Sequence, residues 1–275
     1  MTPPRPFPFV LLALGALALS GCVAGEDLAG AAPGGGGACA APATIADADD
    51  DLAIFGTACS SLTTFTEGGE TWRVQTFRSG RGPLFIVPHD DEDAALSTAA
   101  WALKTYGGTV VAVETGGRRF NGRIDPNRNF DAGALACGKP GRSERFVSAM
   151  LPGGSPVVAL HTNSPGSAKT GGSGSISMRA PYAGATAFPA QGPLAKEDAM
   201  VILAARGGPA SVKRLTDRLN AAGVNVLVET VDPSRTDCSL SHYAVTKGLT
   251  YVNVEAAHGD GATQRAILEI VMREI

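Results

Sequence analysis

The chain has 275 residues, of which 44% are hydrophobic, 18% charged and 6% aromatic, which suits one sizeable hydrophobic core and is short for two. Its 23 Lys and Arg against 26 Asp and Glu give a formal net charge of -3. The chain therefore lacks the basic excess of a nucleic-acid binder and the acidic tracts of a disordered protein, and one globular domain is expected.

Residues 1–21 predict an export signal. Arg5 precedes the apolar run Phe9–Leu19, which is much shorter than the roughly 20 residues of a membrane-spanning helix. The segment Leu19–Cys22 resembles the bacterial lipobox and predicts cleavage before Cys22, with a lipid on its sulfur. The alternative is an ordinary secretory peptide with an unmodified Cys22. Either reading predicts export, and the first predicts a lipid-anchored protein in the bacterial cell envelope.

Residues 22–45 are rich in Gly, Ala and Pro, which predicts a flexible tether, and residues 46–275 are expected to form the catalytic domain. Four cysteines follow Cys22, an even number in an oxidising compartment, so disulfides are expected. Three pairings are possible, and sequence order favours Cys39 with Cys59 and Cys137 with Cys238.

Short apolar, β-branched runs alternate with helix-like stretches along the remaining chain. The runs predict strands over Pro83–Pro88, Thr109–Glu114, Pro156–Leu160, Met200–Ala205, Val224–Glu229 and Thr250–Glu255. The helix-like stretches are Asp91–Tyr106, Ser143–Met150, Ala210–Ala222 and Ala262–Glu274. This alternation predicts a single α/β domain with a twisted, mixed, largely parallel sheet and helices on both faces. The Gly-, Ser- and Pro-rich stretch Asn163–Pro193 shows no periodicity and predicts a long loop.

Polar residues follow three of the predicted strands, where an open α/β sheet places its ligand site. His89 and Glu92 follow the first strand, His161 follows a later one, and Glu255 closes the last. A His and a Glu three residues apart can reach one ion from the same turn, and His161 supplies a third ligand. Two histidines and one glutamate with an open fourth position predict a catalytic zinc site.

The segment Asp125–Gly133 reads Asp-Pro-Asn-Arg-Asn-Phe-Asp-Ala-Gly. It resembles the Asn-Arg segment of zinc carboxypeptidases of the carboxypeptidase A type, and it is similar to the Asp-x-Asn-Arg-x-Phe of the succinylglutamate desuccinylase and aspartoacylase group. The order of His-x-x-Glu, Asn-Arg, His and a late Glu also resembles that superfamily, while the sequence between these islands does not. The resemblance implies a zinc carboxypeptidase-like fold.

The resemblance further implies that His89, Glu92 and His161 bind one zinc ion. It implies that Glu255 is the general base that activates the zinc-bound water and passes the proton to the leaving amine. Asn127 and Arg128 would then hold the free carboxylate of the substrate, a task for which the planar fork of arginine is suited.

An arginine upstream of Asn127 would stabilise the oxyanion of the tetrahedral intermediate. Spacing favours Arg119, with Arg123 second, while Arg118 also competes for this role. Tyr243 is the nearest counterpart of the mobile tyrosine of these enzymes, or it is an ordinary buried aromatic residue. The resemblance implies that the loop which partly sets specificity in these enzymes lies near Asp237–Leu240 here, and the sequence gives no side-chain preference for it.

His242 and His258 lie on either side of Glu255 in sequence and are expected either to support the site or to be plain polar histidines. The function expected from these residues is zinc-dependent hydrolysis of an amide bond next to a free carboxylate, in cell-wall or other extracytoplasmic peptides. One alternative is an N-acyl amino acid deacylase, and another is a peptide-binding lipoprotein without turnover. Besides a peptide or N-acyl amino acid, the expected partner is a membrane, reached through the lipid.

Overall fold

The computed structural model describes residues 51–131, 143–163 and 176–275, and all of them belong to one compact unit, Ala38–Ile275. The predicted signal peptide, the tether and Cys22 lie outside these residues. In the part of the chain that the structure describes, no helix combines the length and hydropathy required to cross a membrane.

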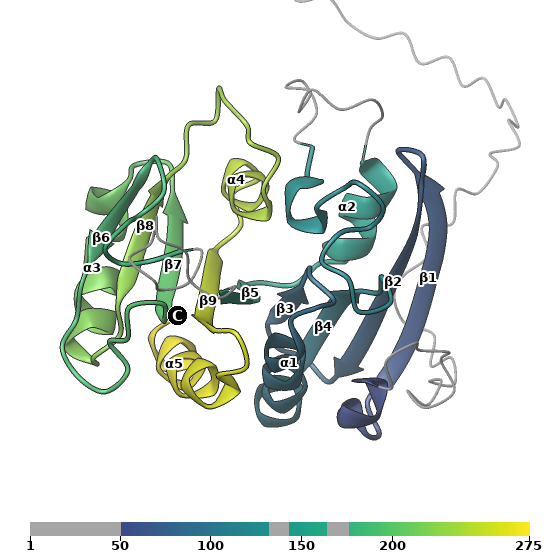
Figure 1. Ribbon diagram of the computed structural model, residues 1–275, viewed down its shortest axis with the longest axis horizontal. Coiled ribbons are helices and arrows are strands. Elements are labelled where there is room, and N and C mark those ends of the chain that lie inside the picture. Colours follow the sequence, from purple (N-terminus) through teal and green to yellow (C-terminus); the bar gives the residue numbers. More distant parts are fainter. Residues whose placement is uncertain (1–50, 132–142, 164–175) are drawn as a thin grey trace, which may run out of the picture. The chain divides into compact units, whose positions relative to one another are not determined.

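A mixed β-sheet forms the centre of this unit (Figure 1), with the strand order β1-β2-β4-β3-β5-β9-β7-β8-β6. The strands are β1 (Cys59–Glu67), β2 (Glu70–Ser79), β3 (Leu84–Val87), β4 (Gly108–Val113), β5 (Val157–Asn163), β6 (Ala185–Phe188), β7 (Met200–Ala205), β8 (Val226–Thr230) and β9 (Tyr251–Ala257). The central strands β4, β3, β5 and β9 are parallel, as β7 and β8 are. The other neighbours are antiparallel, so the expected parallel character holds for the centre of the sheet and for the β7–β8 pair, and not for the remaining flanking pairs.

Helices cover both faces of the sheet, as the sequence predicted. They are α1 (Asp93–Tyr106), α2 (Glu144–Met150), α3 (Pro209–Ala221), α4 (Leu240–Thr246) and α5 (Gly261–Glu274), with short 3-10 turns η2 (Asp51–Phe55) and η3 (Pro126–Arg128). α1, α3 and α5 contribute to one buried cluster, and α2 and α4 contribute to the other. In Figure 1, α1 and α5 lie below the sheet, whereas α2 and α4 lie above it.

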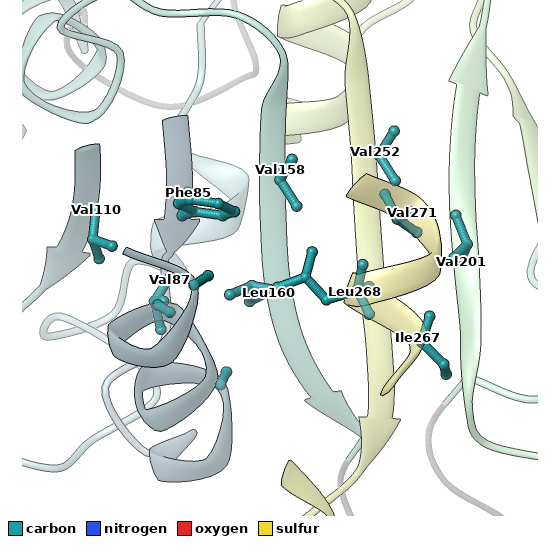
Figure 2. Packing of buried hydrophobic residues seen from close by; sticks show 14 of the residues in the cluster. Phe85, Val87, Val110, Val158, Leu160, Val201, Val252, Ile267, Leu268 and Val271 are labelled. Carbon is teal, nitrogen blue, oxygen red and sulfur yellow. The ribbon is translucent and has the colours of Figure 1, made fainter. Parts of the chain in front are cut away.

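The two clusters follow from the alternation of side chains along each strand. Val158 and Leu160 of β5 face the cluster of α1 and α5, while Val157 and Ala159 face the other. Figure 2 shows the first cluster at close range, where residues of the last helix pack against the central strands. The labelled residues are Phe85, Val87, Val110, Val158, Leu160, Val201, Val252, Ile267, Leu268 and Val271. This alternation leaves the next residue, His161, on the side of α2 and α4.

Local sequence sets several helix ends. Gly107 follows α1 with φ 69° and donates its N–H to Leu103 O, a left-handed conformation that glycine adopts at little cost. Asp260 accepts a hydrogen bond from Thr263 N at the start of α5. The hydroxyl of Ser239 accepts one from His242 N at the start of α4. Such side chains satisfy amide groups that the first helical turn leaves without partners.

Four elements were not predicted from the sequence: the hairpin of β1 and β2, the short strand β6, and the seven-residue helix α4. β1 lies at one edge of the sheet and β6 at the other, so both carry many partly exposed polar or small residues instead of an apolar run. The expectation of a loop throughout Asn163–Pro193 was wrong over Ala185–Phe188 because an edge strand needs little apolar periodicity.

Candidate metal and catalytic site

Three side chains with metal-binding atoms meet beside the central strands. His89 and Glu92 follow β3, and His161 lies within β5, one position past its predicted end. Their ligand atoms all lie within 4.8 Å of one another. All three residues are buried, with exposed fractions of 2%, 2% and 3%. The structure therefore brings together the three residues that the sequence predicted as zinc ligands.

The contacts within this group converge on the two Nδ1 atoms and the carboxylate. His89 Nδ1 lies 2.9 Å from Glu92 Oε1, and His161 Nδ1 lies 3.4 Å from Glu92 Oε2. The two Nδ1 atoms are 3.2 Å apart. Two imidazole nitrogens and a carboxylate are the donors that zinc accepts in catalytic sites. His161 Nε2 is buried and has no hydrogen-bond partner among the described residues. These donors fit a zinc ion.

The Asp125 carboxylate contacts His89 Nε2, the ring nitrogen that does not contact Glu92. Its Oδ1 lies 2.9 Å from His89 Nε2 and accepts a hydrogen bond from Asn127 N at 2.8 Å. A carboxylate in this position orients a metal-binding histidine and fixes its tautomer. Burial lowers the pKa of His89, but the hydrogen bonds to Asp125 and Glu92 outweigh it and raise the pKa to about 9. The sequence placed Asp125 in a motif but did not reveal this role.

The Glu92 carboxylate contacts both histidines of the site and two further groups. Burial raises the pKa of its carboxyl, but His161 and His89 outweigh burial and hold the pKa well below its usual range. Its Oε2 accepts a hydrogen bond from Thr162 N at 2.8 Å, and its Oε1 accepts one from Arg119 Nη1 at 2.7 Å. Glu92 is therefore ionised. Its carboxylate is held by His161 and Thr162 of β5 as well as by His89 of its own turn.

The structure separates the three candidate arginines. Arg119 reaches Glu92, whereas Arg123 is exposed and Arg118 is exposed with its Nε donating to Thr115 O. Burial lowers the pKa of Arg119, but Glu92 outweighs burial and raises it. The guanidinium beside the proposed metal position therefore belongs to Arg119, the arginine that the sequence favoured.

Glu255 lies on the strand next to His161. β5 and β9 are parallel, and His161 is directly paired with Glu255 in their register, so both side chains point to the same face. Glu255 is 3% exposed, and its Oε1 accepts a hydrogen bond from Asn253 Nδ2 at 3.0 Å. Burial raises the pKa of Glu255 and outweighs the lowering effect of His161, and Glu92 raises the pKa further. A carboxyl with a raised pKa accepts a proton more readily, as a general base must.

Asn127 and Arg128 lie in the 3-10 turn η3, which Asp125 caps. The guanidinium of Arg128 pairs with Asp237, and its side chain is 46% exposed. Asn127 Oδ1 is buried and finds no hydrogen-bond partner among the described residues. A substrate carboxylate would therefore meet an accessible guanidinium and would compete with Asp237 for it.

Tyr243 lies away from these groups. Its ring is 6.1 Å from the Phe130 ring, it packs on the cluster under α4, and Lys247 Nζ lies 5.4 Å from its ring centre. Tyr243 is only partly buried, and these contacts are those of an aromatic residue that packs at the edge of the core, so its substrate-binding role stays a prediction. Tyr182, which the sequence did not reveal, lies nearer to the site. Burial raises the pKa of its hydroxyl, and Glu229 and Glu255 raise it further.

His242 and His258 make contacts other than the expected support of Glu255. His242 Nε2 lies 3.5 Å from Glu229 Oε1, and its Nδ1 lies 3.8 Å from Asp237 Oδ1. Glu229, Asp237 and His242 thus form a second group of possible metal-binding side chains, whose ligand atoms also lie within 4.8 Å of one another. His258 is exposed and lies 3.5 Å from Thr162 Oγ1.

Cys59 and Cys238 are both disulfide-bonded. The partners favoured by sequence order, Cys39 and Cys137, lie outside the described residues, so the pairing stays a prediction. Cys238 has a φ of 62°, and its carbonyl accepts a hydrogen bond from Phe130 N at 3.0 Å. The loop that carries Asp237 is therefore attached to the Asn-Arg segment through its backbone.

No protein-family profile matches this sequence, and no curated protein matches it. Among solved structures, the chain is similar to an aspartoacylase family protein from Mesorhizobium loti, with 16% identity and a TM-score of 0.45 over 78% of this chain and 65% of that one. It is also similar to a succinylglutamate desuccinylase/aspartoacylase from Rhodobacter sphaeroides, with 13% identity and a TM-score of 0.40 over 85% and 68% of the two chains.

A third similar structure is the murein-tripeptide amidase MpaA from Escherichia coli O157, with 14% identity and a TM-score of 0.40 over 73% of this chain and 86% of that one. The names match the resemblance predicted from the motifs. The chain spans less than two thirds of the length of the aspartoacylase family structure. The activity is therefore argued from the residues of the site.

Proposed function

We propose that this protein is a zinc-dependent hydrolase that cleaves an amide bond next to a free carboxylate. The observation that carries the proposal is the buried group of His89, Glu92 and His161, with Glu255 paired to His161 on the adjacent strand. The proposed metal ligands, the proposed base and an arginine lie close together, and this combination would serve metal-assisted hydrolysis.

Each residue has a task in this scheme. His89, Glu92 and His161 would hold zinc, which when bound lowers the pKa of water and polarises a carbonyl. Glu255 would take the proton from the attacking water at a carboxylate oxygen and deliver it to the leaving nitrogen. Arg119 would turn its guanidinium from Glu92 toward the oxygen on which negative charge develops. Arg128 would bind the substrate carboxylate in place of Asp237.

Metal content and turnover test the proposal together. The wild type should contain about one zinc per chain by elemental analysis, and a His89→Ala/His161→Ala double variant should contain none. Glu255→Gln should keep the zinc and lose hydrolysis, because the amide cannot accept the proton. Absence of bound zinc after incubation with the metal, or full activity of Glu255→Gln, would contradict the proposal.

The substrate panel should contain short peptides with a free C-terminus, stem peptides of the cell wall, and N-acetyl and N-succinyl amino acids. Each should be paired with a version whose carboxylate is amidated. Cleavage restricted to free peptides supports a carboxypeptidase, and cleavage restricted to N-acyl amino acids supports a deacylase. Peptide binding with no turnover on the whole panel would point to the non-catalytic alternative.

We further propose that the chain is anchored by lipid at Cys22 in the bacterial cell envelope, outside the cytoplasm. The support is the signal-like segment that ends in Leu19–Cys22, and the test is fractionation of a bacterial host that makes the full chain. The wild type should be found with membranes and should carry the mass of a lipid on Cys22. Cys22→Ser should be found in the soluble fraction, and an equal distribution of both would exclude the anchor.

A further inference from the structure

The turn that supplies two of the proposed metal ligands also contains a carboxylate that points elsewhere. Asp90 follows His89 directly, and its Oδ2 accepts hydrogen bonds from Thr115 N at 2.7 Å and from Gly117 N at 2.9 Å. These donors lie in the loop after β4, far from Asp90 in sequence. The side chain of Asp90 therefore connects the metal-binding turn to the loop that leads to Arg119.

This loop has the form of an anion-binding nest. Gly116 and Gly117 have φ values of 72° and 69°, which turn successive backbone N–H groups toward one side. Thr115 N and Gly117 N converge on one oxygen of Asp90, while Gly116 N donates to Glu114 Oε1 at 2.8 Å. A charged acceptor strengthens such bonds, so Asp90 fixes a glycine-containing loop that would otherwise have many conformations.

The hydroxyl of Thr115 extends the connection toward the arginines. Its Oγ1 lies within hydrogen-bond distance of Asp90 Oδ2, at 3.2 Å, and of the Arg118 carbonyl. Arg118 N also lies 3.3 Å from this hydroxyl. The carbonyl and the N–H of Arg118, immediately before Arg119, thus both contact the Thr115 hydroxyl. The Arg119 guanidinium lies 2.7 Å from Glu92 Oε1.

We propose that Asp90 is a positioning residue for Arg119, acting through the backbone of Thr115 and Gly117. One short turn would then supply two metal ligands, His89 and Glu92, and also the carboxylate that places the arginine beside them. This inference rests on the proposed function for its catalytic consequence, but the placement itself can be measured without any turnover.

The first test measures the exposure of the Arg119 guanidinium in the full chain by modification with phenylglyoxal, followed by mass spectrometry of each arginine. Asp90→Ala should raise the modification rate of Arg119 several-fold, because the guanidinium leaves Glu92. Arg123, which is exposed already, is the internal reference. Asp93→Ala is the matched control, because it removes an exposed carboxylate from the start of α1 and should leave the Arg119 rate unchanged.

Two further variants keep the inference testable if Asp90→Ala does not fold. Thr115→Val keeps the size of the side chain but removes the hydroxyl beside the Arg118 carbonyl, so it should also accelerate modification of Arg119. Asp90→Asn keeps an amide oxygen that can accept the two N–H groups and should recover at least part of the protection. Unchanged Arg119 rates in both Asp90→Ala and Thr115→Val would overturn the inference.

A double-mutant cycle on the active enzyme supplies the catalytic readout. With Arg119 present, Asp90→Ala should lower kcat about 100-fold with little change in KM, because a displacement of about 1 Å can have that effect. In an Arg119→Ala background, the same change should have an effect below about threefold, since the positioned group is absent. Equal effects in both backgrounds, with zinc content unchanged, would show that Asp90 acts independently of Arg119. A wild type that hydrolyses nothing would contradict the proposed function while the modification rates still test the placement.

Discussion

Glu92 contacts four groups from three segments of the chain at once. His89 and Arg119 lie at Oε1, and His161 and the Thr162 amide lie at Oε2. Buried charges are tolerated only when they are paired and hydrogen-bonded, and these contacts meet that requirement for the buried carboxylate of Glu92. Removal of any one member should therefore disturb the rest, which makes the surrounding residues better targets for substitution than Glu92 itself.

Asp125 is one such target. Asp125→Asn keeps an oxygen for the Asn127 amide but removes the negative charge beside His89 Nε2. Zinc affinity should fall about 10- to 100-fold, as it does when a carboxylate that orients a metal-binding histidine is lost. Competition with a chelator measures this, and Asp217→Asn, which alters an exposed pair with Lys213, should leave the affinity unchanged. An unaltered affinity in Asp125→Asn would remove Asp125 from the site.

The two tyrosines give a matched comparison. Tyr182 interacts electrostatically with Glu255 and Arg128, whereas Tyr243 packs against Phe130. If the Tyr182 hydroxyl donates a hydrogen bond to a charged group of the bound substrate, Tyr182→Phe should lower kcat/KM about tenfold. Tyr243→Phe should change kcat/KM less than about twofold. The reverse order of effects on the best substrate of the panel would return the substrate-binding role to Tyr243.

Glu255 should make the stability of the metal-free protein depend on pH. Burial raises the pKa of Glu255 above its ordinary value of 4.5, so the folded protein binds this proton more tightly than the unfolded chain. The free energy of unfolding is therefore reduced as pH rises from the ordinary value through the raised one. Glu255→Gln should be more stable than the wild type near pH 7.5 and equal to it near pH 4, measured by urea unfolding. A difference that is the same at both pH values would contradict this.

The candidate site could be predicted from sequence where spacing is local. His89 and Glu92 share one turn, Asn127 and Arg128 are adjacent, and their order along the chain matches known motifs. The roles of Asp90, Asp125 and Tyr182 could not be predicted, because each depends on a contact between segments that are distant in sequence. Spacing already favoured Arg119 over Arg118 and Arg123, but its contact with Glu92 depends on the path of a loop with two left-handed glycines.

At the level of elements, apolar runs predicted the central strands, and β7 agrees with its predicted range. Burial on both faces makes such strands visible in sequence. The edge strands and α4 were invisible because half of their residues face solvent or because the element is very short. The parallel or antiparallel direction of the flanks was also not readable, since it depends on which strands become neighbours.

α5 provides a test at this scale. Asp260 caps α5 through Thr263 N and also accepts a hydrogen bond from Lys196 Nζ at 2.7 Å. Asp260→Ala should lower the free energy of unfolding by about 1 kcal/mol, the usual effect of losing such a cap. Asp93→Ala, at the start of α1 where no side-chain cap occurs, should change it by less than about 0.5 kcal/mol. Urea unfolding of both variants checks this, and equal effects would argue against the cap.

For the molecule as a whole, zinc should act as a stabilising ligand. A free concentration about 100 times the dissociation constant adds about 2.7 kcal/mol to the stability, which raises Tm by roughly 5 to 10 °C for a domain of this size. Thermal unfolding with and without zinc measures the shift, and the His89→Ala/His161→Ala variant should show none. An undiminished shift in that variant would place the binding elsewhere, for instance near Glu229, Asp237 and His242.

The direct pairing of His161 with Glu255 on adjacent strands has a consequence for the evolution of the chain. Because successive strand residues point to opposite faces, one residue inserted or deleted in either strand before these positions would turn a proposed ligand or the proposed base toward the helices on the other side. Insertions in loops that contain no proposed site residue carry no such penalty. Lineages that descend from this sequence should therefore vary in the length of those loops while the spacing within β5 and β9 stays constant.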